Sequence, residues 1–303
     1  MIPLSWTMTL GRWFAAPACW YVRTFPRSPG RWRFTKPLRS WIKTLYPEAG
    51  HDRVVQLSSG AKLRVDAGDF LGRHVYVCGE YEESTTSIVK SLVRPGDCVL
   101  DVGANIGYFT VCMAVWVGPT GSVHAFEAAP RIHSRLQSNI DLNGLRNVTI
   151  HAVALSDHEG TVPFFEATHD HLGISSLRQL DSSEARRIEV RCTTLDSLLP
   201  AGTRVRLAKI DVEGAEMLVL EGMRGVLERD SPYIVLELTD EFLRKVRGSA
   251  AEVIAFLRDR GYTLYRIEWD CLVPLEETAP KQCNVLCIPA GQPVATALPV
   301  RRG

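Results

Sequence analysis

A short apolar run that ends in a glycine-containing turn constrains the fold of this chain more than any other feature. Residues 98–102 read Cys-Val-Leu-Asp-Val, and the turn Gly103-Ala-Asn-Ile-Gly107 follows directly. An apolar run of this length is typical of a buried strand, and glycines let the backbone turn sharply. Because ligands bind at the carboxyl ends of the strands in an open parallel sheet, we expect this turn to border a ligand site.

A rhythm of strand, turn and helix repeats from residue 98 onward. Strands are predicted at 98–102, 121–127, 148–154, 205–210, 233–238, 263–267 and 284–288, and helices at 108–116, 130–142, 215–228 and 250–260. A hairpin at 54–66 and a helix at 84–93 precede this rhythm, and an antiparallel pair at 161–166 and 188–192 interrupts it. Alternating elements of this kind predict a mostly parallel sheet covered by helices on both faces.

The charge of the chain is divided unevenly along its length. Residues 1–47 hold eight Lys/Arg and no Asp/Glu, so the remaining 27 basic and 34 acidic residues give that part a charge of −7. We predict a basic, Trp/Arg-rich N-terminal extension (1–47), one main domain (48–290) and a loose C-terminal tail (291–303). The extension also holds five of the seven tryptophans and six prolines, and we expect the prolines to break any long amphipathic helix.

Two roles stay open for this extension. Tryptophan interleaved with arginine suits an anionic surface, such as a lipid headgroup layer, a polyanion or a partner protein. The alternative is an irregular segment that packs its aromatic side chains onto the main domain or a sister subunit. We favour this packing role over a peripheral membrane contact or a protein contact, because the prolines interrupt the segment.

Composition excludes some classes of protein. The net charge of +1 offers no argument for nucleic-acid binding, and we expect no nucleic-acid partner. No run of 18 uncharged apolar residues appears, and the N-terminus lacks the basic start of a signal peptide, so we expect a cytoplasmic protein. The eight cysteines form no CxxC pair and read as reduced thiols, and zinc ligation by Cys283 and Cys287 is a weaker alternative.

The spacing of the turn discriminates between cofactors. A dinucleotide fingerprint would place glycine at positions 103, 105 and 108, but this chain has Asn105 and Tyr108 at the last two. These side chains obstruct the close approach of a pyrophosphate. The acidic Asp101 instead suits a ligand with a cationic head, and Glu127, at the end of the next strand, can accept hydrogen bonds from ribose hydroxyls.

Seven motifs occur in one order over roughly residues 75–290. They are Gly79-Glu-Tyr-Glu82, Asp101–Gly107, Ala125-Phe-Glu127 with Pro130, Ala154-Leu-Ser-Asp157, Gly173-Ile-Ser-Ser-Leu177, Thr194-Leu-Asp196 and Lys209-Ile-Asp-Val-Glu-Gly-Ala-Glu216. This set resembles the FkbM-like family of class I S-adenosylmethionine-dependent methyltransferases. Ala128 departs from the family, which more often has proline there.

The resemblance implies a Rossmann-like α/β fold with a seven-stranded, mostly parallel sheet, helices on both faces and a small β-hairpin insertion. It also implies S-adenosyl-L-methionine as the cofactor. The residues it assigns to cofactor binding are Asp101, Gly103 and Asn105 for the methionine part, Glu127 for the ribose, and Ser156 and Asp157 beside the adenine. Independently of the resemblance, Gly107 lets a ligand lie against the turn, and Tyr81 and Glu82 can close the opposite side of the cleft. Structural roles compete with several of these: Asp101 can cap the following helix, Glu127 can be a surface charge, and Asp157 can belong to a turn.

Methyl transfer to a hydroxyl requires alignment of donor and acceptor and removal of a proton. Asp211 and Glu213, which follow the fourth strand, are candidate catalytic groups, as is His171 in the polar loop 167–187. Glu213 and Glu216 can instead supply negative charge at the first turn of the next helix. We predict no metal ligand, although His169 and His171 leave that possibility open.

We therefore expect an O-methyltransferase acting on a hydroxyl of a sugar, glycan or secondary metabolite. The Asp/Asn-Pro-Pro-Tyr motif of N-methyltransferases is absent. A rival hypothesis is a non-catalytic S-adenosylmethionine-binding module tethered through its basic extension, and a third is a Rossmann oxidoreductase. The sequence specifies neither the acceptor nor the oligomeric state.

Overall fold

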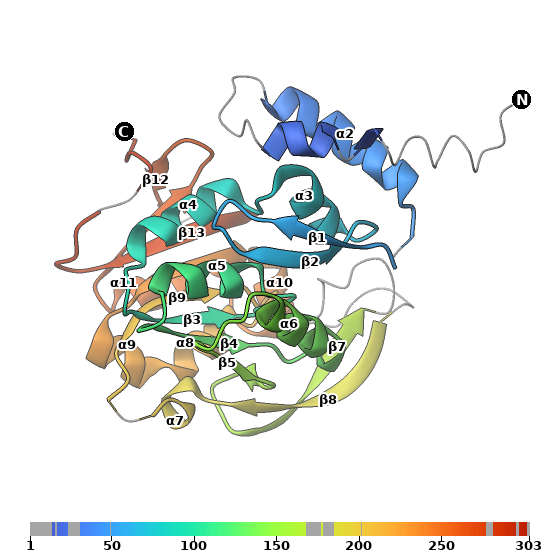
Figure 1. Cartoon of the computed structure of the whole chain (residues 1–303). Helices are drawn as coiled ribbons and strands as arrows, with labels where there is room; N and C mark the ends of the chain where they lie inside the picture. The colour runs from blue at the N-terminus through green and yellow to red at the C-terminus, as the bar shows by residue number, and fades with distance from the viewer. Residues whose placement is uncertain are drawn as a thin grey trace, which may run out of the picture.

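A central sheet of eight strands forms the core of the molecule in this computed structural model (Figure 1). The structure describes residues 14–15, 17–23, 31–48, 50–167, 177, 185–200, 202–276, 281–294 and 297–301. The strands run in the order β12 (Leu272–Pro274), β11 (Tyr262–Ile267), β13 (Gln282–Pro289), β10 (Tyr233–Thr239), β9 (Val205–Ile210), β3 (Cys98–Val102), β4 (Ser122–Phe126), β5 (Val148–His151).

Five neighbouring strands of this sheet, β10, β9, β3, β4 and β5, pair in parallel. The remaining strands, β13, β11 and β12, pair antiparallel along the other edge. The predicted α/β class with a mostly parallel sheet is therefore confirmed. The predicted strand number is wrong by one, because β12 spans only three residues and is too short to leave a periodic pattern.

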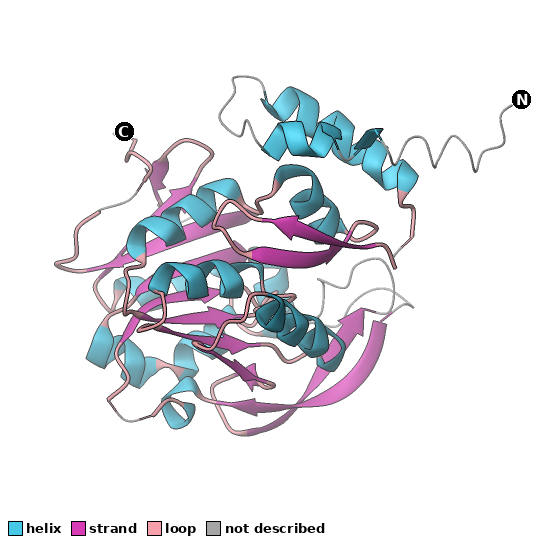
Figure 2. Ribbon diagram, in the orientation of Figure 1, coloured by secondary structure: helices cyan, strands magenta, loops and turns pink. Residues whose placement is uncertain are grey.

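Helices cover both faces of the sheet (Figure 2). Successive residues of β3 point to opposite faces, so Val99 belongs to one apolar cluster and Leu100 to the other. The first cluster includes residues of α4 (Glu83–Leu92) and α5 (Tyr108–Val117), and α6 (Pro130–Leu142) contributes to it and to a third cluster. The second cluster includes residues of α8 (Glu216–Gly222), α9 (Arg224–Asp230), α10 (Asp240–Val246) and α11 (Ala250–Arg258). This three-layer arrangement leaves the carboxyl ends of the parallel strands at one edge.

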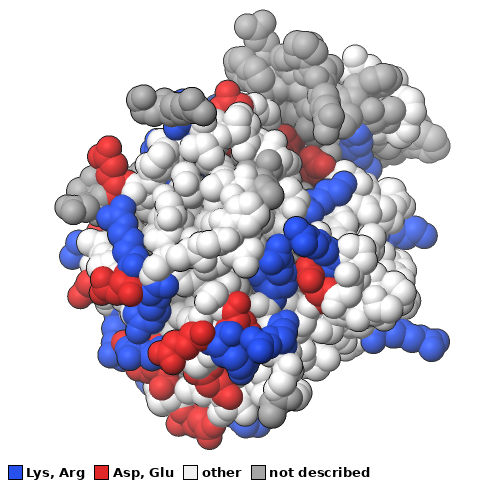
Figure 3. Space-filling view, turned by 90° about the vertical axis from the view of Figure 1, so that its left-hand side faces the viewer, with Lys and Arg blue, Asp and Glu red and all other residues white. Residues whose placement is uncertain are grey.

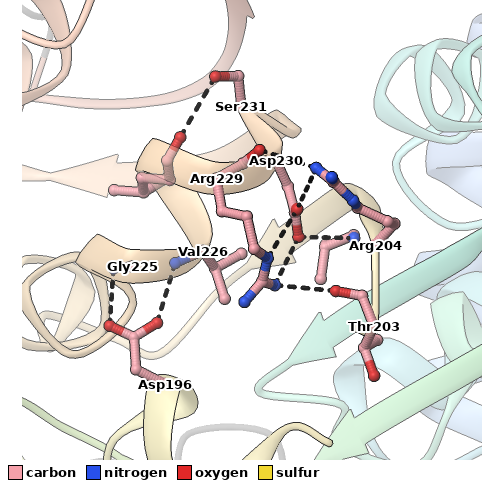
Figure 4. Close-up of polar contacts among 10 residues, drawn as sticks. Asp196, Thr203, Arg204, Gly225, Val226, Arg229, Asp230 and Ser231 are labelled. Carbon is pink, nitrogen blue, oxygen red and sulfur yellow. Dashed lines mark hydrogen bonds and ion pairs between the residues drawn. The ribbon is translucent and has the colours of Figure 1, made fainter. Parts of the chain in front are cut away.

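The single helix predicted over 215–228 is two helices, α8 and α9, interrupted at Met223. The start of α9 is held from outside: the Asp196 carboxylate accepts the backbone N–H groups of Gly225 at 2.8 Å and Val226 at 2.9 Å (Figure 4). At the other end of α9, Asp230 accepts the N–H of Val205 at 3.0 Å. Asp196, in the short helix α7 (Leu195–Leu198), therefore provides the N-terminal acceptor that a helix start requires.

The predicted hairpin insertion is present as β7 (Gly160–Ala167) and β8 (Ala185–Thr193), joined by the two-residue β6 (Ala154–Leu155) into a three-stranded sheet. The hairpin predicted at 54–66 is present as β1 (Asp52–Gln56) and β2 (Lys62–Asp66). The helix α3 (Phe70–Cys78), which follows it, was not predicted from the sequence. His171 falls in the part of the β7–β8 connection that lies outside the described residues.

The N-terminal extension is more regular than predicted. Residues 17–23 are helical, and α2 (Arg31–Leu45) continues through Pro37, although proline in a helix interior costs about 3 kcal/mol. Burial offsets this cost, because Ile42, Leu45 and Tyr46 join the main apolar core. The expectation that the prolines would prevent a long amphipathic helix is therefore wrong, and α2 packs beside α3 (Figure 1).

The described end of the C-terminal segment is held by the sheet. Leu272 of β12 donates its backbone N–H to the Pro299 carbonyl, and Arg301 donates to the Leu272 carbonyl, each at 2.8 Å. This part of the predicted tail is therefore not loose, because its backbone pairs with an edge strand. All eight cysteines are free thiols, and Cys287 lies fully buried in the core. Among the described residues, no helix has the length and apolarity needed to cross a membrane.

Candidate active site

A cavity of about 720 Å³ opens where the parallel strands β3, β4, β9 and β10 end. This volume lies within the range of about 300–1,000 Å³ that is usual for small-molecule sites. Ala128, Ile132, Val153 and Leu155 supply an apolar wall, whereas Asp101, Glu127, Asp211 and Glu237 supply carboxyl groups. The cavity can therefore contact both apolar and charged parts of a ligand.

The turn after β3 passes directly against the turn after β9. Gly103 has a φ of +81°, and a Cβ atom there would lie 1.8 Å from the Asp211 carbonyl oxygen. The N–H of Asp211 in turn donates to the Val102 carbonyl at 2.9 Å. Only glycine satisfies both the backbone conformation and the close approach, so the predicted turn brings the Asp211 segment to the cavity.

Strained backbone gathers around the cavity. Of the four described non-glycine residues with positive φ, Glu82, Asn105 and Glu213 line the cavity with φ values between 46° and 54°, and Ser231 ends α9. Residues other than glycine rarely adopt this conformation, and each instance costs roughly 1–3 kcal/mol. Such residues cluster at functional sites, so their grouping here makes the cavity the candidate functional region of the fold.

Asp101 lies at the floor of the cavity and is only 1% exposed. Its carboxylate accepts a hydrogen bond of 2.5 Å from the Thr110 hydroxyl, on the first turn of α5. Burial raises the pKa of Asp101, and the ammonium of Lys209 opposes this shift. A cationic ligand group in the cavity would further stabilise the ionised carboxylate.

Glu127 directly follows β4 and faces the same cavity. One carboxylate oxygen accepts the Asn105 N–H and the other accepts the Ala129 N–H, both at 2.8 Å. Burial raises the pKa of Glu127 to about 7, although these backbone donors favour the charged form. Each oxygen retains a lone pair for a ligand hydroxyl, so the geometry suits the predicted ribose contact.

Three carboxyl groups that line the cavity meet in one place. Glu82, Asp211 and Glu237 each place an oxygen within 4.8 Å of those of the other two, and we call them the carboxylate cluster. The buried Lys209 donates to Asp211 at 2.7 Å. Asn284 of β13 donates to Glu82 at 3.2 Å.

The cluster has unusual acid–base properties. Burial, with the charges of Asp211 and Glu82, raises the pKa of Glu237 to about 7, against a hydrogen bond from Gln282 and the charge of Lys209. Burial alone would lower the pKa of Lys209, but the carboxylates of Asp211, Glu82 and Asp101 outweigh burial and raise it. The cluster therefore has two kinds of acidic group. Asp211 is paired with the ammonium of Lys209, whereas Glu237 has a pKa of about 7.

The structure brings most of the predicted site residues together. Asp101, Gly103, Asn105, Glu127, Tyr81, Asp211 and Glu213 all line the cavity. The Tyr81 ring lies edge-on to the Tyr108 ring at 5.9 Å between centroids, which closes the cavity on the α5 side.

Three predicted cofactor contacts lie elsewhere: the described residues lining the cavity do not include Gly107, Ser156 or Asp157. Gly107 begins α5, and a Cβ atom there would lie 2.6 Å from Leu136 Cδ1, so its role in this structure is close packing. Asp157 pairs with Arg247 at 2.5 Å and His158 at 2.7 Å. The cavity is lined instead by the three residues just before Ser156, which are Val153, Ala154 and Leu155.

Sequence analysis missed Glu237, Lys209, Gln282 and Asn284 as members of the site. Glu237 lies near the carboxyl end of β10, which pairs with β9. An acidic residue near the end of a predicted strand could have identified Glu237 from the sequence. Asn284 faces Glu237 across the antiparallel β10–β13 pair. Glu216, by contrast, accepts the N–H groups of Val212 and Gly214 and holds the turn before α8.

Comparison with known proteins identifies the family of this chain. A family model described as the methyltransferase FkbM domain matches residues 101–264, more than half of the chain. The chain belongs to the FkbM methyltransferase family. Membership confirms both the methyltransferase class and S-adenosyl-L-methionine as the cofactor.

Two relatives match most of this FkbM-family chain. Methyltransferase 1 of Beauveria bassiana is 26% identical over 233 residues, which cover 70% of this chain and 87% of that protein. The 31-O-demethyl-FK506 methyltransferase FkbM of Streptomyces tacrolimicus is 29% identical over 242 residues, 69% of this chain and 88% of its own. Among solved structures, a methyltransferase FkbM from Methylobacillus flagellatus KT aligns with a TM-score of 0.44 at 15% identity, covering 70% of this chain and 52% of that one.

Proposed function

We propose that this FkbM-family methyltransferase transfers a methyl group from S-adenosyl-L-methionine to a hydroxyl group of a small molecule. Sugars, glycans and secondary metabolites are the acceptor classes we favour. The Streptomyces tacrolimicus relative is named for methylation at an oxygen atom, which agrees with this choice. The observation that carries the proposal is the carboxylate cluster, because a hydroxyl acceptor must lose a proton as its bond to carbon forms.

The cofactor supplies an electrophilic methyl group, and the cavity fits it in two respects. Gly103 leaves room where any Cβ atom would collide with the opposite turn, and Glu127 presents a buried carboxylate at the end of β4. Asp101 and Asn105 would hold the amino-acid end of the cofactor, and Glu127 would hold the ribose. The apolar wall at Val153 and Leu155 would contact the adenine.

Glu237 is the group we assign as general base. A base works best when its pKa lies near the working pH, and the pKa of Glu237 is about 7. Asp211 is less suited to this task, because Lys209 donates to it at 2.7 Å and stabilises its charged form. Asp211 would instead accept the hydroxyl hydrogen bond that orients the acceptor, and Glu213 would line the acceptor side.

The carboxylate cluster also has the oxygen donors that a divalent cation prefers. The ammonium of Lys209 already supplies a positive charge to the same carboxylates, and the cofactor would add a sulfonium and an ammonium. We therefore expect turnover to continue in the presence of a strong chelator. Loss of turnover on chelation, with recovery on adding Mg²⁺, would assign the cluster to a metal instead.

The direct test is incubation of the full chain with methyl-labelled cofactor and a panel of sugars, glycolipids and polyketide-like alcohols. Mass spectrometry should detect a mass increase of one methyl group on an oxygen of at least one acceptor. Labelling of nitrogen alone would overturn the proposed chemistry. Cofactor binding without transfer to any member of the panel would favour the rival hypothesis of a non-catalytic binding module.

The isosteric variant Asp101→Asn tests the site separately. It preserves the shape beside Thr110 but removes the negative charge, so cofactor affinity should fall while the folded structure persists. Calorimetric titration measures the affinity, and circular dichroism checks the fold. Unchanged affinity would overturn the placement of the cofactor's cationic end beside Asp101.

A further inference from the structure

The helices of the N-terminal extension have two different faces. The inner face is buried in the main apolar core. It consists of Ala15, Cys19 and Val22 from the first helical segment and of Ile42 and Leu45 from α2. This inner face fixes the extension to the body. The outer face is what the methyltransferase function leaves unexplained.

The described helices of the extension also expose large aromatic side chains, and we call this exposed part the outer face. Phe14 is 69% exposed, Trp20 61%, Tyr21 57% and Trp41 37%. In the rest of the described chain, the exposed large aromatic residues are Phe70, at the start of α3, and Trp269. A soluble surface rarely gathers so many large aromatic groups unless they contact a partner or a lipid surface.

The charge of the extension has a single sign. Residues 1–47 carry eight Lys/Arg and no acidic residue, and Lys36 and Lys43 are exposed on α2. The body is different: on the face shown in Figure 3, basic and acidic side chains lie next to one another. The exposed Lys36 and Lys43 give this part of the extension a positive charge, which is complementary to an anionic surface.

We infer that this outer face docks the chain on an anionic phospholipid surface, with Trp20, Tyr21 and Trp41 in the headgroup layer and Lys36 and Lys43 beside the lipid phosphates. Amphipathic aromatic rings prefer the boundary between lipid chains and water, and lysine adds attraction to anionic lipids. A nucleic acid would match the charge but would not require a cluster of exposed aromatic side chains on helices.

The extension is also connected to the cavity. On α2, Arg39 contacts His74 of α3 at 2.7 Å, and the His74 ring lies edge-on to the Tyr81 ring at 5.6 Å. Tyr81 lines the cavity, as does the exposed Phe70 at the start of α3. Docking would therefore hold the rim of the cavity close to the lipid surface, where amphipathic acceptors concentrate. This consequence rests on the proposed function, whereas the docking itself does not.

The test is co-sedimentation of the full chain with vesicles of phosphatidylcholine alone and of phosphatidylcholine with phosphatidylglycerol. Two double variants remove the two components of the surface: Trp20→Ser with Trp41→Ser, and Lys36→Glu with Lys43→Glu. A matched control combines Trp269→Ser with Lys90→Glu, which change an exposed tryptophan and an exposed lysine on the body. Cofactor binding, measured on every variant, verifies that each one folds.

We expect the chain to bind anionic vesicles, to bind more weakly as salt is raised, and to bind neutral vesicles poorly. The lysine double variant should bind at least ~10-fold more weakly, because each basic residue near an anionic surface contributes substantially to binding. The tryptophan variant should also lose binding, and the control should match the parent chain.

Three results would overturn the inference: failure of the parent chain to bind, equal binding to neutral vesicles, or equal loss of binding in the control. So would a change in oligomeric state of the extension variants without any vesicle binding, which would identify a second copy as the occupant. None of these results depends on methyl transfer, so they leave the proposed function untouched.

Discussion

A Cβ atom on Gly103 would lie 1.8 Å from the carbonyl oxygen of Asp211, so these two turns of the backbone are in direct contact. The first turn follows β3 and the second follows β9, and the two strands are parallel neighbours. Their contact brings the proposed cofactor-binding turn and the carboxylate cluster into one cavity. The spacing of donor and acceptor therefore depends on a position where only glycine fits.

The variant Gly103→Ala should disrupt this contact. The methyl group meets a backbone atom that cannot move away, and φ is +81°, so we expect the protein to lose about 1–3 kcal/mol of stability. A displacement of about 1 Å between the turns should lower kcat/KM about 100-fold. Gly202→Ala is the matched control, because its φ is +88° but no atom lies within 4 Å. Equal loss of activity in both variants would contradict the role of the contact.

Cofactor affinity should depend on pH through Glu127. Burial raises the pKa of Glu127 to about 7 in the ligand-free protein, whereas ribose hydroxyls bind the ionised carboxylate. Affinity should therefore rise as pH increases toward 7 and become constant above it, with a limiting slope of about tenfold per pH unit below the pKa. Calorimetric titration from pH 5.5 to 8.5 measures this, and Glu127→Gln should bind weakly with a flat profile. A steep profile retained in that variant would assign the titration to another group.

The rate of methyl transfer should depend on Glu237 in the same direction. A general base acts only when deprotonated, so kcat should rise with pH until about 7 and then level off. Glu237→Gln should lower kcat by roughly 10²–10⁴-fold and leave cofactor affinity within about twofold, since the contribution of a positioned base is of that size. Initial rates with an acceptor found by the labelling panel provide the measurement. Retention of full activity would transfer the role of base to Asp211 or Glu213.

Lys209 should control the charge state of the whole cluster. Replacing it with methionine leaves the half-buried carboxylates without their cation, which should destabilise the protein by up to about 3–5 kcal/mol, the cost of breaking a fully buried ion pair. In the surviving folded fraction, the pH–rate profile should shift to higher pH, because Lys209 lowers the pKa of Glu237. Lys209→Arg retains the charge and should keep the profile near its original position. Thermal unfolding and initial rates test the two effects separately.

Asp196→Ala should affect stability alone. The change removes the acceptor for the N–H groups of Gly225 and Val226, and the loss of a helix N-cap costs about 0.5–2 kcal/mol. The contact lies in α7 and α9, and Asp196 is not among the cavity residues (Figure 4). Denaturant unfolding should show the loss, while kcat and KM stay unchanged. A change in KM without a change in stability would contradict this structural role.

The sequence by itself determined the local elements with strong patterns. Strands 98–102 and 205–210 and helix 130–142 occur with the predicted bounds, because apolar period, glycine and N-terminal proline act within a few residues. The same reasoning placed the glycine-containing turn after β3 and the acidic residues after β4 and β9 at one site, and the structure brings them to one cavity. Those residues needed only their position on a strand to be assigned to the cavity.

Tertiary structure decided the rest. The three-residue strand β12 and the passage of α2 through Pro37 depend on neighbours distant in sequence, because their own patterns are too weak or unfavourable. The carboxylate cluster combines Glu82, Asp211 and Glu237 from three separate segments, and Lys209 is buried among their charges. A pKa near 7 arises from that burial and those neighbouring charges, and neither exists until the parallel strands align their carboxyl ends.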